Sequence, residues 1–477
     1  MEWFDASGYE LARQVLQRGT AAIFVVAFLS GFRQFPALLG EHGLLPAPVF
    51  LRTTYARTQP TIFRLHYSDR MLRIVCAIGI LVAALLVAGL PQLGPPWVPL
   101  IAFLLLWGLY LSIVSIGQTF YSFGWESLLL EAGFIVAFLG SDEIAPPIVV
   151  IFFLRWLVFR LEFGAGMIKM RGDRVWRDLT ALYYHHETQP MPNPLSRWVH
   201  LLPKWFHRLE VLGNHFAQLI VPWFLFLPQP IASVAAAIVV LTQLWLVATG
   251  NFAWLNFLTM VLAFAAIGDG AVHWLIQAWP AATSYEATPP AFTLIVLAVF
   301  VLLIVISWPP LKNLFSRRQL MNASFNRWHL VNAYGAFGSI TRPRYEVVIE
   351  GSQADSPSED DWLPYEFHGK PGDVRRVPRQ FAPYHLRLDW LMWFLALGSH
   401  DTGWFRMLLV RLLEADRPTL RMLRVDPFAG EPPRWIRARL YLYRFATHRE
   451  RRESHTWWMR EDAGMLVEPS SLRGGGS

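Results

Sequence analysis

Cysteine is nearly absent from this chain, which has 477 residues and a single cysteine, Cys76. One cysteine excludes an intramolecular disulfide and a Cys-x-x-Cys exchange motif, so the chain is not a thiol oxidoreductase on its own. The sequence also lacks a Gly-x-Ser-x-Gly elbow, a P-loop, a His-Glu-x-x-His motif and a dinucleotide-binding fingerprint. No motif therefore indicates the reaction of a soluble enzyme.

Charged residues are scarce as well. They make up 16% of the chain, whereas soluble proteins contain about 25%. Hydrophobic residues reach 54%, aromatic residues 15%, and the mean hydropathy is +0.32. The net charge of +7 is typical of a membrane protein that meets anionic headgroups. Because no motif of a nucleic-acid reader accompanies that charge, we expect membrane lipids and not nucleic acid as partners.

What the sequence does contain is about nine apolar stretches, each long enough to cross a bilayer. The chain opens on acidic and polar residues and not on a basic leader, so we expect the first stretch to act as an uncleaved insertion signal. We predict a membrane all-α helical bundle over residues 1–312. The predicted spans are 18–35, 71–90, 97–117, 123–140, 146–166, 209–228, 231–249, 252–275 and 291–308.

The last third of the chain has a different pattern. Two segments, 345–350 and 435–445, alternate in polarity and are rich in β-branched or aromatic residues, as strands are. Two others, 386–397 and 404–413, have the apolar spacing of helices. We predict a mixed, β-containing soluble domain over residues 313–472. Residues 473–477, which end in Gly-Gly-Gly-Ser, are interpreted as a linker left by cloning and are excluded from the fold.

The basic residues are concentrated in loops after the odd-numbered spans, for example at Arg57, Arg174 and Lys312. Loops after the even-numbered spans are short and neutral or acidic, as in Ser141-Asp142-Glu143. By the positive-inside rule, the basic loops and the C-terminal domain would be cytoplasmic.

Several long motifs resemble the lipase maturation factor family. They cover nearly the whole chain, in order. The motifs are GEHGLLP (40–46), FGWESLLLE (123–131), FNRWHLVNAYGAFGSITRPRYEVVIEG (325–351), YEFHGKPGD (365–373), APYHLRLDWLMWFLAL (382–397) and PPRWIRARLYLYRF (432–445).

This resemblance implies a multi-span membrane protein that assists the folding or assembly of exported lipases. In animals such proteins lie in the endoplasmic reticulum, with the large C-terminal domain in the lumen. The equivalent here is an exoplasmic domain on a bacterial cytoplasmic membrane, which disagrees with the positive-inside rule; we favour the family orientation. The animal proteins have lumenal cysteines that this chain lacks, so no redox role carries over, and the client need not be a lipase.

Ionisable residues within the spans need separate attention, because each is costly in lipid and is usually paired or functional. Arg155, Glu162 and Lys169 are spaced seven apart and share one side of a helix. Glu126 and Glu131 of the preceding span are their predicted partners. Two interpretations stay open: a buried clasp of ion pairs that fixes helix register, or a polar cavity with Lys169 at its mouth.

Other polar residues are expected to face the same interior. His215 lies in the predicted sixth span, and Asp269 and His273, four residues apart, could form a hydrogen bond along one helix face. No third ligand accompanies that pair at a diagnostic spacing, so we expect neither a metal site nor a cofactor.

Residues 164–176 also resemble, more weakly, a segment of the vitamin K-dependent gamma-carboxylase and of the horizontally transferred transmembrane (HTTM) proteins related to it. In that family a lysine after a glycine-rich span end is the base that initiates the chemistry. The resemblance implies that Lys169 could be a catalytic base in a membrane-embedded enzyme, the alternative to an assembly factor.

The remaining candidates lie outside the spans. His185 and His186 belong to a proline-rich loop that could form a lid over the basic end of the fifth span, or act as a plain connector. In the tail, several aromatic and polar residues could bind a client if they are exposed, or support the domain if they are buried. These client-binding candidates are Trp328, His329, Asn332, Tyr334, Tyr384, His385 and Trp390. The oligomeric state is not indicated.

Overall fold

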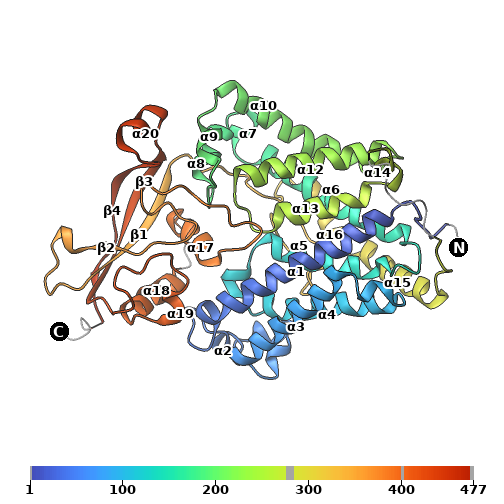
Figure 1. Cartoon of the computed structure of the whole chain (residues 1–477), viewed down its shortest axis with the longest axis horizontal. Coiled ribbons are helices and arrows are strands. Elements are labelled where there is room, and N and C mark those ends of the chain that lie inside the picture. The colour runs from blue at the N-terminus through green and yellow to red at the C-terminus, as the bar shows by residue number, and fades with distance from the viewer. Residues whose placement is uncertain (1–2, 276–283, 399–401, 473–477) are drawn as a thin grey trace.

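The computed structural model describes residues 3–275, 284–398 and 402–472. The predicted linker at 473–477 lies outside these residues. Helices fill most of the molecule, and a small antiparallel sheet stands at the end far from the N-terminus (Figure 1). A helical bundle followed by a C-terminal domain with a small sheet is therefore confirmed.

The bundle is built from long helices with shorter ones between them. The long helices are α1 (Glu10–Leu39), α3 (Asp69–Ala88), α4 (Trp97–Val114), α5 (Gly124–Val136), α6 (Ile148–Arg171), α10 (Lys204–His215), α12 (Ile231–Thr249) and α15 (Pro290–Ile306). The shorter helices are α2 (Ala47–Phe50), α7 (Arg174–Arg177), α8 (Leu182–Thr188), α9 (Ser196–His200), α11 (Val221–Phe224), α13 (Leu255–Ala263), α14 (Asp269–Leu275) and α16 (Trp308–Phe315).

The predicted count of nine spans is not confirmed. Among the described residues, five helical segments are long and apolar enough to cross a membrane: α1, α3, α4, α12 and the continuous α15–α16. Their outer faces are apolar and exposed; Ile74, Leu81 and Leu85 on α3 and Val301 and Val305 on α15 are examples. Exposed apolar faces of this extent are typical of contact with lipid.

The remaining predicted spans are not among these five segments, and the structure shows why for each of them. Helix α5 has 13 residues and is buried on nearly every face, so its apolar sequence is that of a core helix. Helix α6 has 24 residues but carries five basic or acidic side chains. The predicted span 209–228 is divided by a π-turn at Phe216–Ile220, and the predicted span 252–275 breaks into α13 and α14.

The C-terminal region contains a four-stranded antiparallel sheet in the order β2-β1-β3-β4. The strands are β1 (Arg344–Ser352), β2 (Leu363–Pro364), β3 (Trp435–Phe445) and β4 (Trp458–Ser470), and the helices are α17 (Arg387–Ala396), α18 (Gly403–Leu413), α19 (Arg417–Leu420) and α20 (His448–Ser454). The predicted strands at 345–350 and 435–445 and the predicted helices at 386–397 and 404–413 are all confirmed within two residues. Helix α17 contacts β1 and lies between the sheet and the bundle (Figure 1).

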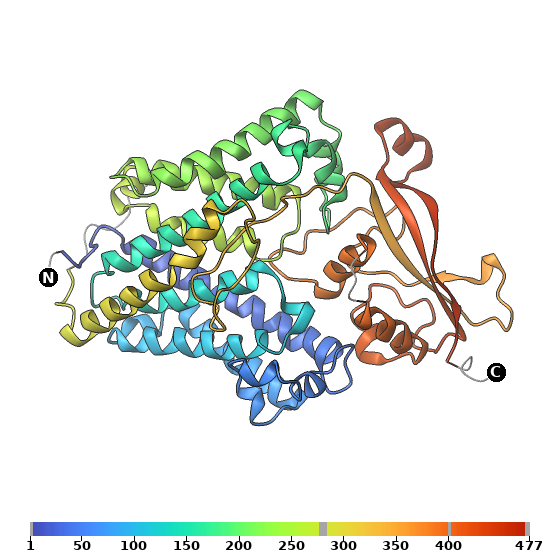
Figure 2. The same ribbon diagram turned by 180° about the vertical axis from the view of Figure 1, so that it is seen from behind.

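A long connection joins the two regions. After α16 the chain runs back along the bundle without helix or strand until β1 (Figure 2). The backbone N–H of Asn332 donates to Glu131 on α5, and that of Asp173, after α6, donates to the carbonyl of Gly338. The predicted domain boundary at residue 313 falls within α16, so the first part of the predicted tail packs against the helical bundle.

Candidate functional site

A cavity of about 800 Å³ lies where the bundle meets the C-terminal region. Its walls come from α5, α6, α8, α10, α12, α17 and the connection before β1. One part of the wall is aromatic, with Phe123, Trp125, Phe252, Phe337, Trp390, Trp393 and Phe394. Another part is polar, with Glu162, Lys169, His185, His186, Glu210, Asn214, Gln218 and Gln243. Such a mixture of apolar surface and a few convergent polar groups is the usual form of a ligand pocket.

Lys169 is buried in the polar part of this wall. Its Nζ donates to Oδ1 of Asn214 at 3.0 Å and to Oε1 of Gln218 at 2.8 Å, and lies 4.8 Å from the centre of the Trp176 ring. Glu162 accepts instead from Gln243 at 2.6 Å. Within the described residues no carboxylate oxygen lies within ion-pair distance of Lys169, so the ammonium is held by neutral groups at the cavity wall.

The predicted partners of Arg155 are wrong. Glu131 on α5 pairs with Arg160, and also accepts from the hydroxyl of Tyr334 at 2.7 Å. Arg155 reaches away from α5 and donates to the carbonyl of Ala265 at 2.9 Å. The reason is helical geometry: residues five apart on α6 point in different directions, and residue 160 is the one that faces α5.

Glu126 forms a second buried cluster, with the C-terminal region. Its Oε1 accepts from Arg387 at 2.6 Å, its Oε2 accepts from the hydroxyl of Tyr110, and Nδ1 of His385 lies 3.6 Å from Oε1. The Arg387 guanidinium also lies 3.5 Å from the centre of the Tyr121 ring. This cluster fixes α17 to α5 and thereby fixes one wall of the cavity against another.

Asp269, His273 and His215 do not join this interior as a group. The Asp269 carboxylate accepts from the backbone N–H groups of Glu10 and Leu11 at 2.9 and 3.0 Å, at the N-terminus of α1, where a negative charge is favoured. His273 is exposed, and among the described residues the Asp269 carboxylate makes no hydrogen bond to it, so the predicted Asp269–His273 bond is not found. His215 donates from Nε2 to the carbonyl of Trp176 at 3.1 Å, next to the residues that hold Lys169.

The segment predicted to be a loop around His185 and His186 is partly helical. Both histidines lie on α8. The His185 ring lies 4.9 Å from the ring of Phe337 across the cavity wall. Burial lowers the pKa of His185 to about 3, so this imidazole is neutral at physiological pH. Burial raises the pKa of Glu187, whose carboxylate accepts from the backbone of Phe445 on β3 at 2.7 Å.

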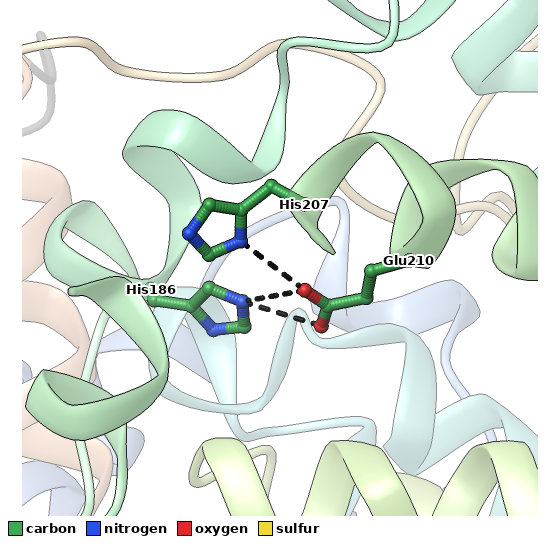
Figure 3. Close-up of side chains that lie close together, drawn as sticks. All are labelled: His186, His207 and Glu210. Atoms are coloured by element: carbon green, nitrogen blue, oxygen red, sulfur yellow. Dashed lines mark hydrogen bonds and ion pairs between the residues drawn. The ribbon is translucent and has the colours of Figure 1, made fainter. Parts of the chain in front are cut away.

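Sequence reasoning missed two residues next to His186. His207 and Glu210 lie one helical turn apart on α10, and both point toward His186 on α8 (Figure 3). Their ligand-type atoms all lie within 4.8 Å of one another. The spacing of a histidine and a glutamate three residues apart on one helix was visible in the sequence, but the third member comes from a different helix.

The tail residues predicted to bind a client are mostly buried. Asn332, Tyr334, His385 and Trp390 are each at most 3% exposed, and Asn332 and Tyr334 contact Glu131. Trp328 is 46% exposed and stacks on Trp107.

The other two candidates, His329 and Tyr384, are half-buried. His329 lies 2.9 Å from the hydroxyl of Ser127, and Tyr384 is partly exposed. Two residues of this set, Tyr334 and Trp390, line the cavity.

Comparisons with known proteins cover nearly the whole chain. The family model described as the lipase maturation factor transmembrane domain matches residues 11–274, and that of the lipase maturation factor C-terminal domain matches residues 330–468. Lipase maturation factor 1 of Homo sapiens is 40% identical over 97% of this chain and 88% of its own length. The protein of that name in Bos taurus is 39% identical over 98% and 91%. Lipase maturation factor 2 of Homo sapiens is 29% identical over 95% and 82%. No solved structure matches the chain.

Proposed function

The chain belongs to the lipase maturation factor family, and from that premise we propose that it is a membrane assembly factor for an exported client of the lipase type. The observation that carries this proposal is the cavity between the bundle and the C-terminal region. Its volume is about 800 Å³, and part of its wall is aromatic. A folding client exposes apolar segments that an apolar wall can shield from water until they are buried.

The geometry favours a cavity of fixed shape. The Glu126–Arg387 pair joins the bundle to α17, and the connection before β1 is bound to Glu131. Phe394 on α17 and Leu397 directly after it line the cavity and are 38% and 41% exposed, which places apolar surface at an opening. We propose that a client enters there, past α17.

A specific observation also favours a second candidate, a membrane-embedded enzyme in which Lys169 acts as a base. Such an enzyme needs a cavity that reaches Lys169, and the cavity does reach it. Two amide oxygens hold the ammonium, and a base could form once its proton leaves.

Substitution at Lys169 separates the two candidates. For an assembly factor, Lys169→Met should leave most client export intact, because the methionine keeps the apolar stem and the aromatic wall is unchanged. For an enzyme, Lys169→Met should abolish function and Lys169→Arg should not restore it, since a guanidinium does not deprotonate. The measurement is secreted client activity in a strain that lacks the native gene and expresses each variant at equal level. Loss of export in both variants, at equal membrane abundance, would contradict the assembly role.

We further propose that the C-terminal region faces the exoplasm of a bacterial cytoplasmic membrane, where an exported client would meet it. This orientation is the one that the family resemblance implies. The positive-inside rule predicts the opposite orientation, with the C-terminal region in the cytoplasm.

The single cysteine makes this orientation testable. Cys76 is buried, so a membrane-impermeant maleimide should not label the native chain. We expect an Ala463→Cys variant, whose thiol would stand on the exposed strand β4, to be labelled in intact cells or spheroplasts. An Ala463→Cys variant that is labelled only after the membrane is opened would reverse the orientation.

A further inference from the structure

Three side chains beside the cavity, two of them buried and one half-buried, are not needed for shielding an apolar client. His186 is 3% exposed and His207 is 2% exposed, and both contact the carboxylate of Glu210. They come from α8 and α10, whose packing brings the three side chains to one point (Figure 3). We propose that His186, His207 and Glu210 bind a divalent transition-metal ion, with zinc the best match to the donor set.

The separation of each histidine nitrogen from the Glu210 carboxylate is that of two ligands on one metal ion. Nε2 of His186 lies 3.3 Å from Glu210, and Nδ1 of His207 lies 3.4 Å from Oε2 of Glu210. A direct hydrogen bond between an imidazolium and a carboxylate is shorter, about 2.7–2.9 Å. A tetrahedral ion with bonds of about 2.0–2.1 Å instead places its ligand atoms about 3.4 Å apart.

The hydrogen bond on the far side of His207 supports the same assignment. Nε2 of His207 lies 3.2 Å from the backbone carbonyl of His200, which can only accept, so Nε2 carries the proton. A neutral His207 then presents the lone pair of Nδ1 toward the Glu210 carboxylate. Two lone pairs facing each other at this site need a proton or a metal ion between them, and a metal ligand has this arrangement, with its other nitrogen bound to a carbonyl.

The Glu210 carboxylate is also held by a hydrogen bond from a residue outside the cluster. Its Oε1 accepts from Nε1 of Trp245 on α12 at 2.6 Å, which fixes the carboxylate plane. Oε2 is the oxygen shared by both histidines, and it is available to a metal ion. A ligating carboxylate that is held by an outer hydrogen bond is characteristic of metal sites.

The donor set indicates which ion binds and where its free position lies. Two imidazoles and one carboxylate, without a thiolate, suit zinc and other first-row divalent ions better than magnesium or calcium. Three protein ligands leave a fourth position open, as in zinc sites that bind water or substrate. His186 and Glu210 line the cavity, so that position is directed to whatever enters it, a carbonyl or carboxylate oxygen being the group that such an ion prefers. This inference does not depend on the identity of the client.

The test is metal binding by the full chain, purified in detergent without a polyhistidine tag. After removal of metal with EDTA and addition of Zn(II) alone, we expect one zinc ion per chain by mass spectrometry, and a raised melting temperature. Cobalt(II) in place of zinc should give the visible bands of a tetrahedral site. His207→Ala and Glu210→Gln should weaken zinc binding by more than about 100-fold, since loss of an outer-shell partner alone costs about 10–100-fold.

Matched controls keep this test decisive. His42→Ala removes an exposed histidine in the turn between α1 and α2 and should bind zinc as the native chain does. Glu210→Gln retains the size of the side chain and can still accept from Trp245, so its elution as a folded monodisperse particle separates lost binding from lost folding. Two results would overturn the proposal: a folded native chain that binds no zinc, or folded His207→Ala and Glu210→Gln variants that bind it as tightly as His42→Ala does.

Discussion

Replacing Arg387 with methionine is expected to destabilise the folded chain by about 3–5 kcal/mol, because it removes one partner of a buried ion pair. Arg387 and Glu126 are both fully buried. The Arg387 guanidinium also donates to the carbonyl of Phe120 at 2.8 Å. Without it, the Glu126 carboxylate is left with no cation within hydrogen-bond reach, apart from His385. In the native chain His385 is neutral, because burial and the neighbouring Arg387 charge lower its pKa to about 3.

A double variant shows whether the pair itself is responsible. Arg387→Met combined with Glu126→Gln leaves no isolated buried charge, so it should recover a large part of the lost stability. The measurement is thermal or denaturant unfolding in detergent, followed by tryptophan fluorescence. The exposed Arg375→Met is the control and should change stability by less than about 0.5 kcal/mol. Equal unfolding of Arg387→Met and Arg375→Met would show that the buried pair does not hold the two regions together.

Filling the cavity is expected to abolish client export while the chain stays folded. Ala336 lines the cavity in the connection before β1 and is only half-buried, so the larger indole of an Ala336→Trp variant can extend into the open space. The cost in stability should stay within about 1–3 kcal/mol, the usual range for an added side chain in a packed site. Export should then fall to the level of a strain without the gene.

The matched control for that variant is Ala463→Trp, on the exposed face of β4, which should leave export unchanged. Both variants are to be compared at equal membrane abundance and with equal elution from a sizing column. Normal export by a folded Ala336→Trp variant would mean that no client or substrate uses the cavity.

Local patterns were enough to predict the elements of the tail. The alternation in residues 435–445 predicted β3 with its observed bounds, and the helical spacing in 404–413 predicted α18 within one residue. The same approach failed for α5, because a helix buried inside a bundle and a helix facing lipid are equally apolar in sequence. Only the length of the helix distinguishes the two cases. The apolar sequence continues from α5 into the short turn that follows, so the end of the helix cannot be read from the sequence.

The polar contacts could not be predicted from one sequence, because their partners are far apart along the chain. Arg387 is 261 residues from Glu126, and Asn332 is 201 residues from Glu131. Helical spacing placed Glu162 and Lys169 on one face, and both line the cavity. It also predicted that Arg155 contacts α5, whereas Arg160 makes that contact. The histidine pair at 185–186 was recognised, whereas His207 and Glu210 were missed, since Glu210 lies at the start of the predicted membrane span 209–228 and His207 just before it.

The most direct test of the account is a quantitative comparison of the exported proteins of the organism that encodes this chain, with and without its gene. The account predicts that at least one exported enzyme of the lipase type loses activity, and that the native chain restores that activity whereas Ala336→Trp does not. An unchanged set of active exported proteins, together with an altered membrane-soluble small molecule that Lys169→Met fails to restore, would contradict the assembly role and support the enzyme.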